Sequence, residues 1–296
     1  MQYLGELSAL LTAFLWSGTS FAFASAAKRI GSLQLNINRM VIASILLLIT
    51  SIIAGFSFLL SISQIINLTI SGIIGLVLGD TFLFKAFQNI GARLSMLLMA
   101  LSPAMSSILA FFFLNEKLPL AGFIGIVVTI FGIAVVVLER KETPNVSYKI
   151  SKIGIVYGLL GALGQAGGLI FAKFAFQDGK LNEMVATFVR IISSAAIMMA
   201  GALIMKRYKN PVLLYKKDLK AFGSTIVGTI LGPYLGITLS LIAIAHTKVG
   251  IAATLMSMMP IIMLPVVRYV YKEKLNWQAI AGAFIAVAGV AVLFLR

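Results

Sequence analysis

The chain has 296 residues, of which 60% are hydrophobic and 11% are charged, with a formal net charge of +15. Its mean hydropathy of +1.04 excludes an ordinary soluble domain, in which about a quarter of the residues carry charge. The absence of cysteine excludes disulfides, thiolate catalysis and thiolate metal sites. In so apolar a chain we interpret the positive charge as basic loops beside anionic lipid headgroups, and we expect no nucleic-acid partner.

Apolar segments of about 20 residues recur along the chain, and each is long enough to cross a hydrocarbon core of about 30 Å. No basic residue precedes Lys28, so the first segment lacks the positive start of a secretory signal and is interpreted as a membrane span. The pattern predicts an all-α integral membrane protein with about ten transmembrane helices. They cover residues 3–27, 33–54, 64–87, 92–114, 119–138, 153–176, 181–205, 219–245, 249–270 and 275–295.

The chain contains an internal duplication, because residues 75–138 recur 157 positions later as residues 232–295. Five crossings per copy is an odd number, so the two copies are predicted to be inverted five-helix repeats, an arrangement typical of secondary transporters. The first repeat is residues 1–138, the linker is residues 139–152 and the second repeat is residues 153–296. Residues that return unchanged include Gly75 as Gly232, Pro103 as Pro260 and Glu116 as Glu273.

The basic residues indicate an orientation. Seventeen Lys and Arg residues lie in loops after odd-numbered segments and five lie on the opposite face. The loop at residues 55–63 has no Lys or Arg, whereas its repeat counterpart at residues 206–220 has six. Because Lys and Arg favour the cytoplasmic side, we expect a multi-pass protein of the cytoplasmic (inner) membrane with both termini outside the cytoplasm.

Asp80 is the only acid well inside a predicted segment. One interpretation is a carboxylate that binds a cationic group or exchanges protons. The other is a structural ion pair with Arg39, Lys85 or Arg93. The repeat counterpart of Asp80 is Ile237, so the fold itself does not require an acid at this position.

Arg39 and its counterpart Arg190 occur at matching depth in the two halves. We interpret them as helix-end arginines that reach lipid headgroups or bond to carbonyl groups. The alternative is a pair of cations that binds a carboxylate or phosphate cargo.

Polar, aromatic and flexible side chains in the segments near Asp80 are further candidates for contact with a cargo, although such residues more often serve packing. In the first segment they are Trp16, Ser17, Thr19 and Ser20, and in later segments Met99, Gln165, Tyr234 and Met256.

Several kinds of chemistry are missing. The chain has one histidine and no Ser-His-Asp set, no HExxH, no paired carboxylates and no phosphate-binding loop. We therefore expect no catalytic residues, no metal, no cofactor and no enzyme activity.

Several short motifs occur in order along the chain: Trp16-Ser17-Gly18, Arg39 with Arg190, Ser102-Pro103, and Asn115-Glu116-Lys117-Leu118 before the fifth segment. With them, nearly the whole chain resembles the drug/metabolite transporter superfamily, in its ten-span branch of EamA-type metabolite exporters. The resemblance implies alternating-access transport, with segments one to four and six to nine around a central cavity and segments five and ten peripheral. Many members have both termini in the cytoplasm, opposite to the orientation that the charges predict here.

We therefore expect a secondary active transporter that exports small organic metabolites such as amino acids, as a monomer or homodimer in the lipid bilayer. The choice of amino acids rests on the resemblance and on the mixed charges of Asp80, Arg39 and Arg190. The alternative is an importer or exchanger of phosphorylated or sugar-linked metabolites. A membrane channel or a membrane-embedded enzyme is a weaker alternative.

Overall fold

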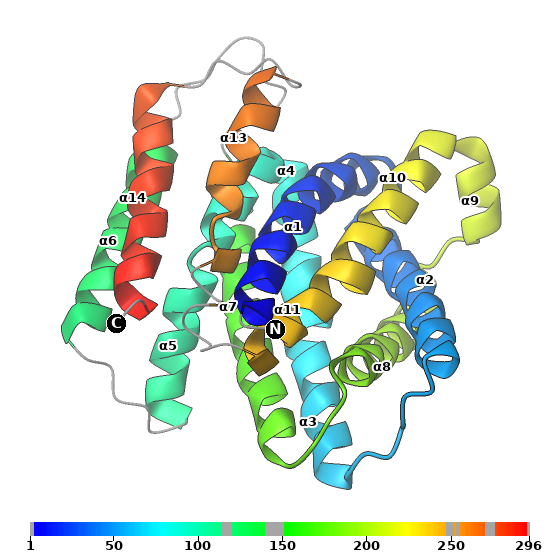
Figure 1. The fold of residues 1–296 in the computed structure, drawn as a ribbon. Coiled ribbons are helices and arrows are strands. Elements are labelled where there is room, and N and C mark those ends of the chain that lie inside the picture. The colour runs from blue at the N-terminus through cyan, green and yellow to red at the C-terminus, as the bar shows by residue number, and fades with distance from the viewer. Residues whose placement is uncertain are drawn as a thin grey trace.

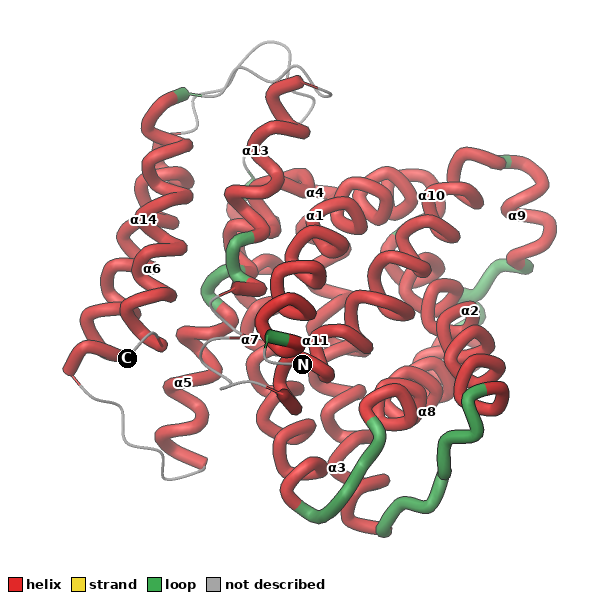
Figure 2. The backbone as a smooth tube through the Cα atoms, in the orientation of Figure 1, coloured by secondary structure: helices red, strands yellow, loops and turns green. Residues whose placement is uncertain are grey.

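The computed structural model describes residues 3–113, 120–139, 151–246, 252, 255–269 and 276–294, and every regular element in these ranges is a helix (Figures 1 and 2). The first half contains α1 (Leu4–Ile30), α2 (Ser32–Ile53), α3 (Ile62–Gly72), the π-helix η1 (Ile73–Gly79), α4 (Asp80–Met99), α5 (Ser102–Phe113) and α6 (Leu120–Glu139). The second half contains α7 (Lys152–Gln177), α8 (Glu183–Ile204), α9 (Pro211–Lys217), α10 (Leu219–Thr229), the π-helix η2 (Ile230–Gly236), α11 (Ile237–His246), α13 (Met259–Tyr269) and α14 (Trp277–Phe294).

Six helical stretches are long and apolar enough to cross a membrane, which supports a multi-pass membrane protein. They are Leu4–Ile30, Ser32–Ile53, Ile62–Met99, Lys152–Gln177, Glu183–Ile204 and Leu219–Ala243. Four shorter apolar helices accompany them: Ser102–Phe113, Leu120–Val136, Met259–Tyr269 and Trp277–Val292. The predicted segment at residues 249–270 and the predicted linker at residues 139–152 lie partly outside the described residues. Ten crossings therefore stay a prediction.

The predicted fourth segment, residues 92–114, is wrong as a single helix. Residues 92–99 belong to α4, and a turn at Ala100 and Leu101 separates them from α5. Inside α4 the helix breaks at Gly91, whose φ of 77° lies in the region that favours glycine. Pro103 lies in the first turn of α5, where a backbone N–H has no partner within the helix, so the missing N–H of proline costs no helical hydrogen bond.

The duplication is visible in the lengths of the elements. Helices α2 and α8 have 22 residues each, and α3 and α10 have 11 residues each. Each of the last two continues into a π-helix of seven residues, η1 or η2. The loop after α2 and its counterpart after α8, which carries α9, lie at opposite ends of the molecule in Figure 1.

Each π-helix packs against the other half of the chain. A Cβ atom at Gly164 of α7 would lie 2.6 Å from the Cα atom of Gly79 in η1. A Cβ atom at Gly236 of η2 would lie 2.7 Å from Cδ1 of Trp16 in α1. These close approaches require glycine, and they join the two halves along α1 and α7.

Helices α6 and α14 form a pair at the side of the molecule and run in opposite directions (Figure 1). Where the two helices touch, Gly132 lies against Gly282 and Gly125 lies against Gly289. A Cβ atom at Gly132 would lie 2.7 Å from the carbonyl oxygen of Gly282, and one at Gly289 would lie 2.8 Å from that of Gly125. Small residues therefore allow these two backbones to approach closely.

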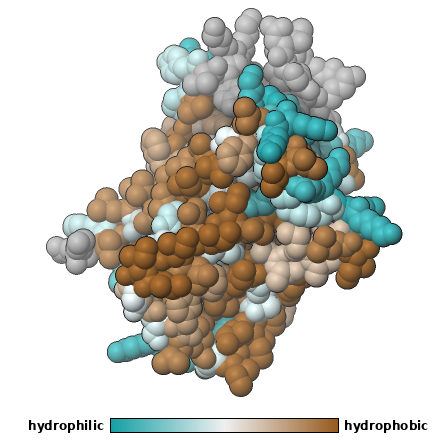
Figure 3. Space-filling model, turned by 90° about the vertical axis from the view of Figure 1, so that its right-hand side faces the viewer, coloured by the Kyte–Doolittle hydropathy of each residue, from teal (hydrophilic) through white to brown (hydrophobic). Residues whose placement is uncertain are grey.

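Large apolar side chains cover the outside of the helices, as a brown band across the face in Figure 3 shows. Over the whole molecule, Phe14, Ile45, Phe123 and Phe284 are examples of exposed apolar side chains, each about half exposed or more. Such a surface suits contact with lipid rather than water. Hydrophilic residues gather toward the upper right of the same face, and α9 with its two lysines lies on this side of the molecule.

Candidate functional site: a cavity between the two halves

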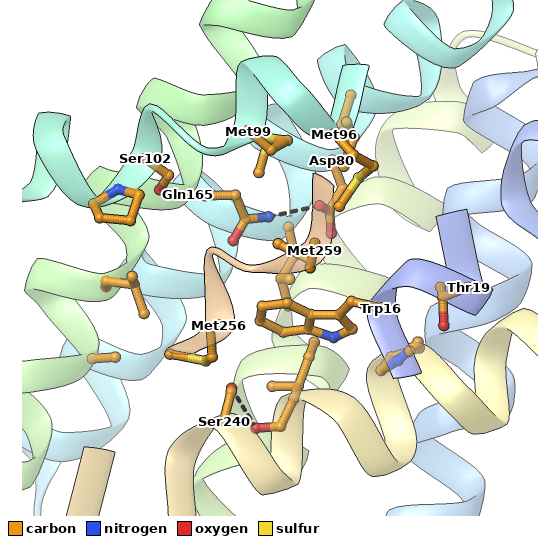
Figure 4. Close-up of a pocket in the computed structure, with 18 of the residues that line it drawn as sticks. Trp16, Thr19, Asp80, Met96, Met99, Ser102, Gln165, Ser240, Met256 and Met259 are labelled. Atoms are coloured by element: carbon orange, nitrogen blue, oxygen red, sulfur yellow. Dashed lines mark hydrogen bonds between the residues drawn. The ribbon is translucent and has the colours of Figure 1, made fainter. Parts of the chain in front are cut away.

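A cavity of about 230 Å³ lies among helices of both halves (Figure 4). In the first half α1, α2, η1, α4 and α5 contribute to its wall, and in the second half α7, α8, η2, α11, the turn before α13, and α13 itself contribute. Among the residues that the structure describes, none of those lining the cavity comes from α6 or α14. The volume is just below the range of about 300–1,000 Å³ that is typical of small-molecule sites.

A buried ion pair joins Arg39 of α2 to Asp80 of α4 in the wall of the cavity, and the two residues are 4% and 5% exposed. The amide of Gln165 in α7 donates a hydrogen bond of 2.6 Å to Oδ1 of Asp80, shown as a dashed line in Figure 4. One carboxylate is thus held by a cation from the first half and an amide from the second. Of the two interpretations of Asp80, the ion pair with Arg39 is present.

Helix η1 positions this network. The carbonyl group of Leu76 accepts a hydrogen bond of 2.9 Å from Nδ2 of Asn36, whose Oδ1 accepts one of 2.9 Å from Nε of Arg39. The carbonyl group of Gly75 accepts a hydrogen bond of 3.2 Å from Gln165. Side chains of α2 and α7 are therefore both anchored to the π-helix that ends immediately before Asp80.

Two aromatic rings complete the surroundings of Arg39. Its guanidinium carbon lies 4.7 Å from the ring centroid of Phe84 and 5.3 Å from that of Phe23, within cation–π range. Arg39 is thus engaged by an acid, an amide and two rings, and its orientation is set before any cargo arrives.

Arg190 lies in the same wall, on α8, and is 3% exposed. Its Nε is buried and has no hydrogen-bond partner among the described residues. A Cβ atom at Gly75 would lie 3.3 Å from Nη2 of Arg190, so the glycine leaves room for the guanidinium group. The interpretation of Arg39 and Arg190 as arginines that reach headgroups is therefore wrong: both are buried in protein.

The cavity brings together nine of the residues singled out in the sequence: Trp16, Thr19, Ser20, Arg39, Asp80, Met99, Gln165, Arg190 and Met256. In Figure 4, Trp16 and Met256 point toward the same space.

Two other candidates lie outside the lining. The hydroxyl of Ser17 donates a 2.7 Å hydrogen bond to the carbonyl of Ala13 in its own helix. The hydroxyl of Tyr234 lies 2.9 Å from that of Thr50 on α2.

Sequence reasoning missed several residues of the wall. Phe23, Phe84, Ser106 and Ser240 line the cavity, and so does Lys173. The signal for Ser106 was its place one turn after the Ser102-Pro103 motif, on the same side of the helix. Nothing in the sequence distinguishes the two phenylalanines from other apolar residues of their helices.

The EamA-like transporter family matches residues 3–138 and 152–295, which are the two halves of the duplication. No curated protein matches the chain. A solved structure described only as "Crystal structure of protein" is similar, with 18% sequence identity and a TM-score of 0.68 over 100% of this chain and 98% of that one. At this identity the likeness shows the fold alone. The match over both halves shows that this chain belongs to the EamA-like transporter family of the drug/metabolite transporter superfamily.

Proposed function

We propose that the protein is a secondary active transporter that exports small organic metabolites, such as amino acids, across the cytoplasmic membrane by alternating access. Membership of the family implies a membrane transporter of small metabolites. The direction, the cargo and the mechanism are our proposal. The observation that carries it is a charged cavity walled by both halves of a duplicated chain.

Alternating access requires two bodies that move against each other around a central site. In this proposal those bodies are two five-helix repeats in inverted orientation, residues 1–138 and 153–296. The opposite directions of α6 and α14 and the crossed glycine pairs between them support this arrangement. So does the placement of the two equivalent loops at opposite ends of the molecule.

The proposed cargo contacts are the nine candidate residues that line the cavity. Trp16, Met99 and Met256 supply apolar surface, and Met side chains adapt to cargoes of different shape. The Arg39, Asp80 and Gln165 network supplies the polar part of the wall. We assign the chain no enzyme activity and no cofactor, and we expect a monomer or homodimer.

The wall also favours a second candidate function, an importer or exchanger of phosphorylated metabolites. Among the residues that the structure describes, those in the wall that can carry charge are the cations Arg39, Lys173 and Arg190 and one acid, Asp80. An excess of positive charge attracts anions. A panel of cargoes that includes sugar phosphates separates this candidate from the first.

The proposal can be tested in proteoliposomes, because the chain has no cysteine. Ser107→Cys places one thiol in the wall, and Ser193→Cys is a matched control on α8, outside the lining. Each serine hydroxyl bonds the backbone carbonyl four residues earlier in its own helix, at 3.0 Å for Ser107 and 2.7 Å for Ser193.

Efflux of a panel of radiolabelled amino acids is measured before and after treatment with a charged methanethiosulfonate. We expect modification at position 107 to stop efflux and treatment of the position 193 variant to leave it unchanged. Efflux that persists after complete modification at position 107 would show that the cavity is not the route. Efflux that is the same with and without a pH gradient would exclude proton coupling through Asp80.

A further inference from the structure

We propose that Arg190 is the anion anchor of the cavity, and that the cargo is a small organic acid with one carboxylate and an apolar body. This inference rests on the proposed transport function and specifies its substrate class. The two Arg residues in this wall differ in their partners: Arg39 forms an ion pair with Asp80 and its Nε bonds Asn36, whereas Nε of Arg190 has no hydrogen-bond partner among the described residues and Asp80 acts on Arg190 only at longer range.

The duplication explains the difference. Arg39 and Arg190 are equivalent, and Asp80 at the start of α4 is equivalent to Ile237 at the start of α11. One half therefore contains both members of an ion pair, and the other retains only the arginine. No acid lies within ion-pair distance of Arg190 among the described residues, while Asp80 already receives bonds from Arg39 and Gln165.

A buried guanidinium nitrogen without a hydrogen-bond partner is costly unless a ligand supplies one. The described residues contain four buried side-chain polar atoms of this kind, and three belong to the cavity wall: Nε of Arg190, Oγ1 of Thr19 and Oγ of Ser106. The fourth, in Ser51, is not in the lining. A guanidinium and two hydroxyls are donors that suit the oxygens of a carboxylate.

The rest of the wall predicts the body of the cargo. Trp16, Phe23, Phe84, Met96 and Met259 present rings and thioethers to the cavity. These surfaces stabilise an apolar group of moderate size. Asp80 already accepts bonds from Arg39 and Gln165, and the described residues of the wall provide no other carboxylate for an amine, so the amino group of an amino acid is not required for binding.

Binding to the purified protein tests this inference without any flux. The probes are 3-phenylpropionate and its neutral isostere 3-phenylpropanamide, which differ in charge and hardly in shape. We expect the acid to raise the melting temperature in a concentration-dependent manner, and the amide to bind at least tenfold more weakly. Phenylalanine is expected to bind no more tightly than 3-phenylpropionate.

Variants assign the effect to residues. Arg190→Gln is expected to weaken binding of the acid at least tenfold, and Arg190→Lys to retain part of it. Thr19→Val and Ser106→Ala are expected to weaken binding while leaving the melting temperature of the unliganded protein equal or higher, because each removes an unpaired buried hydroxyl. Arg29→Gln, in an exposed ion pair with Asp218, is the control and should bind as the parent does.

Equal binding of acid and amide, or undiminished binding by both Arg190 variants, would overturn the inference. Tighter binding of phenyl phosphate than of 3-phenylpropionate would overturn the choice of a carboxylate. These outcomes are separate from the transport test: a cavity that conducts neutral solutes but does not select acids contradicts only this inference. Selective binding of acids without any flux contradicts only the proposed function.

Discussion

Arg39 and Arg190 occupy equivalent positions in the two halves, yet within the described part of the chain only Arg39 forms an ion pair, with Asp80. Inside a membrane protein, buried charges persist where they serve a pathway or a partner. The pair with Asp80 and the hydrogen bond from Gln165 make Arg39 part of the framework of the site. Arg190, at the same depth on α8, is left as the group that a mobile anion can approach.

The Arg39 and Asp80 pair should contribute to stability as a unit. Asp80→Asn leaves the buried Arg39 without a counter-charge, and a loss of about 3 kcal/mol is expected. Arg39→Gln removes the ion-pair partner of Asp80, which keeps the hydrogen bond from Gln165 and the more distant charge of Arg190. The double variant removes both charges, so its loss in unfolding free energy should be well below the sum of the single losses. Thermal unfolding in detergent of the parent, the two single variants and the double variant measures this.

The exposed pair of Arg29 and Asp218, with 3.0 Å between Nη1 and Oδ2, serves as the control for this cycle. Its side chains are 39% and 30% exposed, so solvent screens the interaction and little coupling is expected. Single losses at Arg39 and Asp80 that simply add in the double variant would contradict a coupled buried pair.

The charge of Asp218 should make the stability of the folded protein depend on pH. It caps α10 by accepting a 2.9 Å hydrogen bond from the backbone N–H of Ala221, and this bond, together with Arg29, holds the pKa of its carboxyl below the usual value. A lowered pKa means that the charged form stabilises the folded state. The contribution is complete above about pH 5 and declines as the pH falls below about 4.

Asp218→Asn retains a capping side chain and removes the charge. Its melting temperature should be lower than that of the parent at pH 7, and the difference should shrink in acid and at high salt. A difference that grows as the pH falls would mean that the charged carboxylate does not stabilise the fold.

The contact of α6 with α14 should not tolerate a side chain at Gly132. A Cβ atom there would collide with the backbone nitrogen of Ala286 and lie 2.7 Å from the carbonyl oxygen of Gly282, and backbone atoms cannot move aside cheaply. Gly132→Ala is expected to lower the unfolding free energy by about 1–3 kcal/mol. Gly201→Ala is the matched control, because nothing lies within 4 Å of a Cβ atom at that helical position. An unchanged melting temperature for Gly132→Ala would show that the two helices can separate without cost.

The helices could be predicted from the sequence because a segment that crosses a lipid bilayer must be long and apolar. The repeat could be recognised because duplication preserves the lengths of these segments. The segment predicted at residues 33–54 is α2, Ser32–Ile53. Several residues that line the cavity were predicted because they are polar side chains inside apolar segments. An amide such as Gln165 is rare on a helix face that contacts lipid. Spacing along one helix, however, does not tell which neighbouring helix lies opposite. The partner of Asp80 therefore stayed open among Arg39, Lys85 and Arg93 until the packing was known.

The burial of Arg39 shows why depth along a helix is a poor guide to exposure. The start of α2 is covered by the loop after α8. Nε2 of Gln34 donates a 3.0 Å hydrogen bond to the carbonyl of Lys209, and the hydroxyl of Tyr208 donates one of 2.9 Å to Asn38. Arg39 itself is enclosed by Phe23 of α1 and by Asp80 and Phe84 of α4. Both the loop, about 170 positions away, and these neighbours belong to other elements, which no local pattern reveals.

Labelling of single cysteines should separate the two equivalent loops. Leu59 lies in the loop after α2 and is 91% exposed, while Leu213 lies on α9 in the corresponding loop after α8 and is 60% exposed. The proposed inversion of the repeats predicts that these loops lie on opposite faces of the membrane, and the basic residues around α9 predict that Leu213 faces the cytoplasm. In intact cells, a membrane-impermeant maleimide should therefore label Leu59→Cys and spare Leu213→Cys, whereas both react after solubilisation in detergent. Labelling of only the position 213 variant would show that the orientation is opposite to the predicted one, and it would still agree with inverted repeats. Equal labelling of both variants from outside would show that the equivalent loops lie on one face of the membrane. The two repeats would then have the same orientation, which contradicts the alternating-access mechanism proposed here.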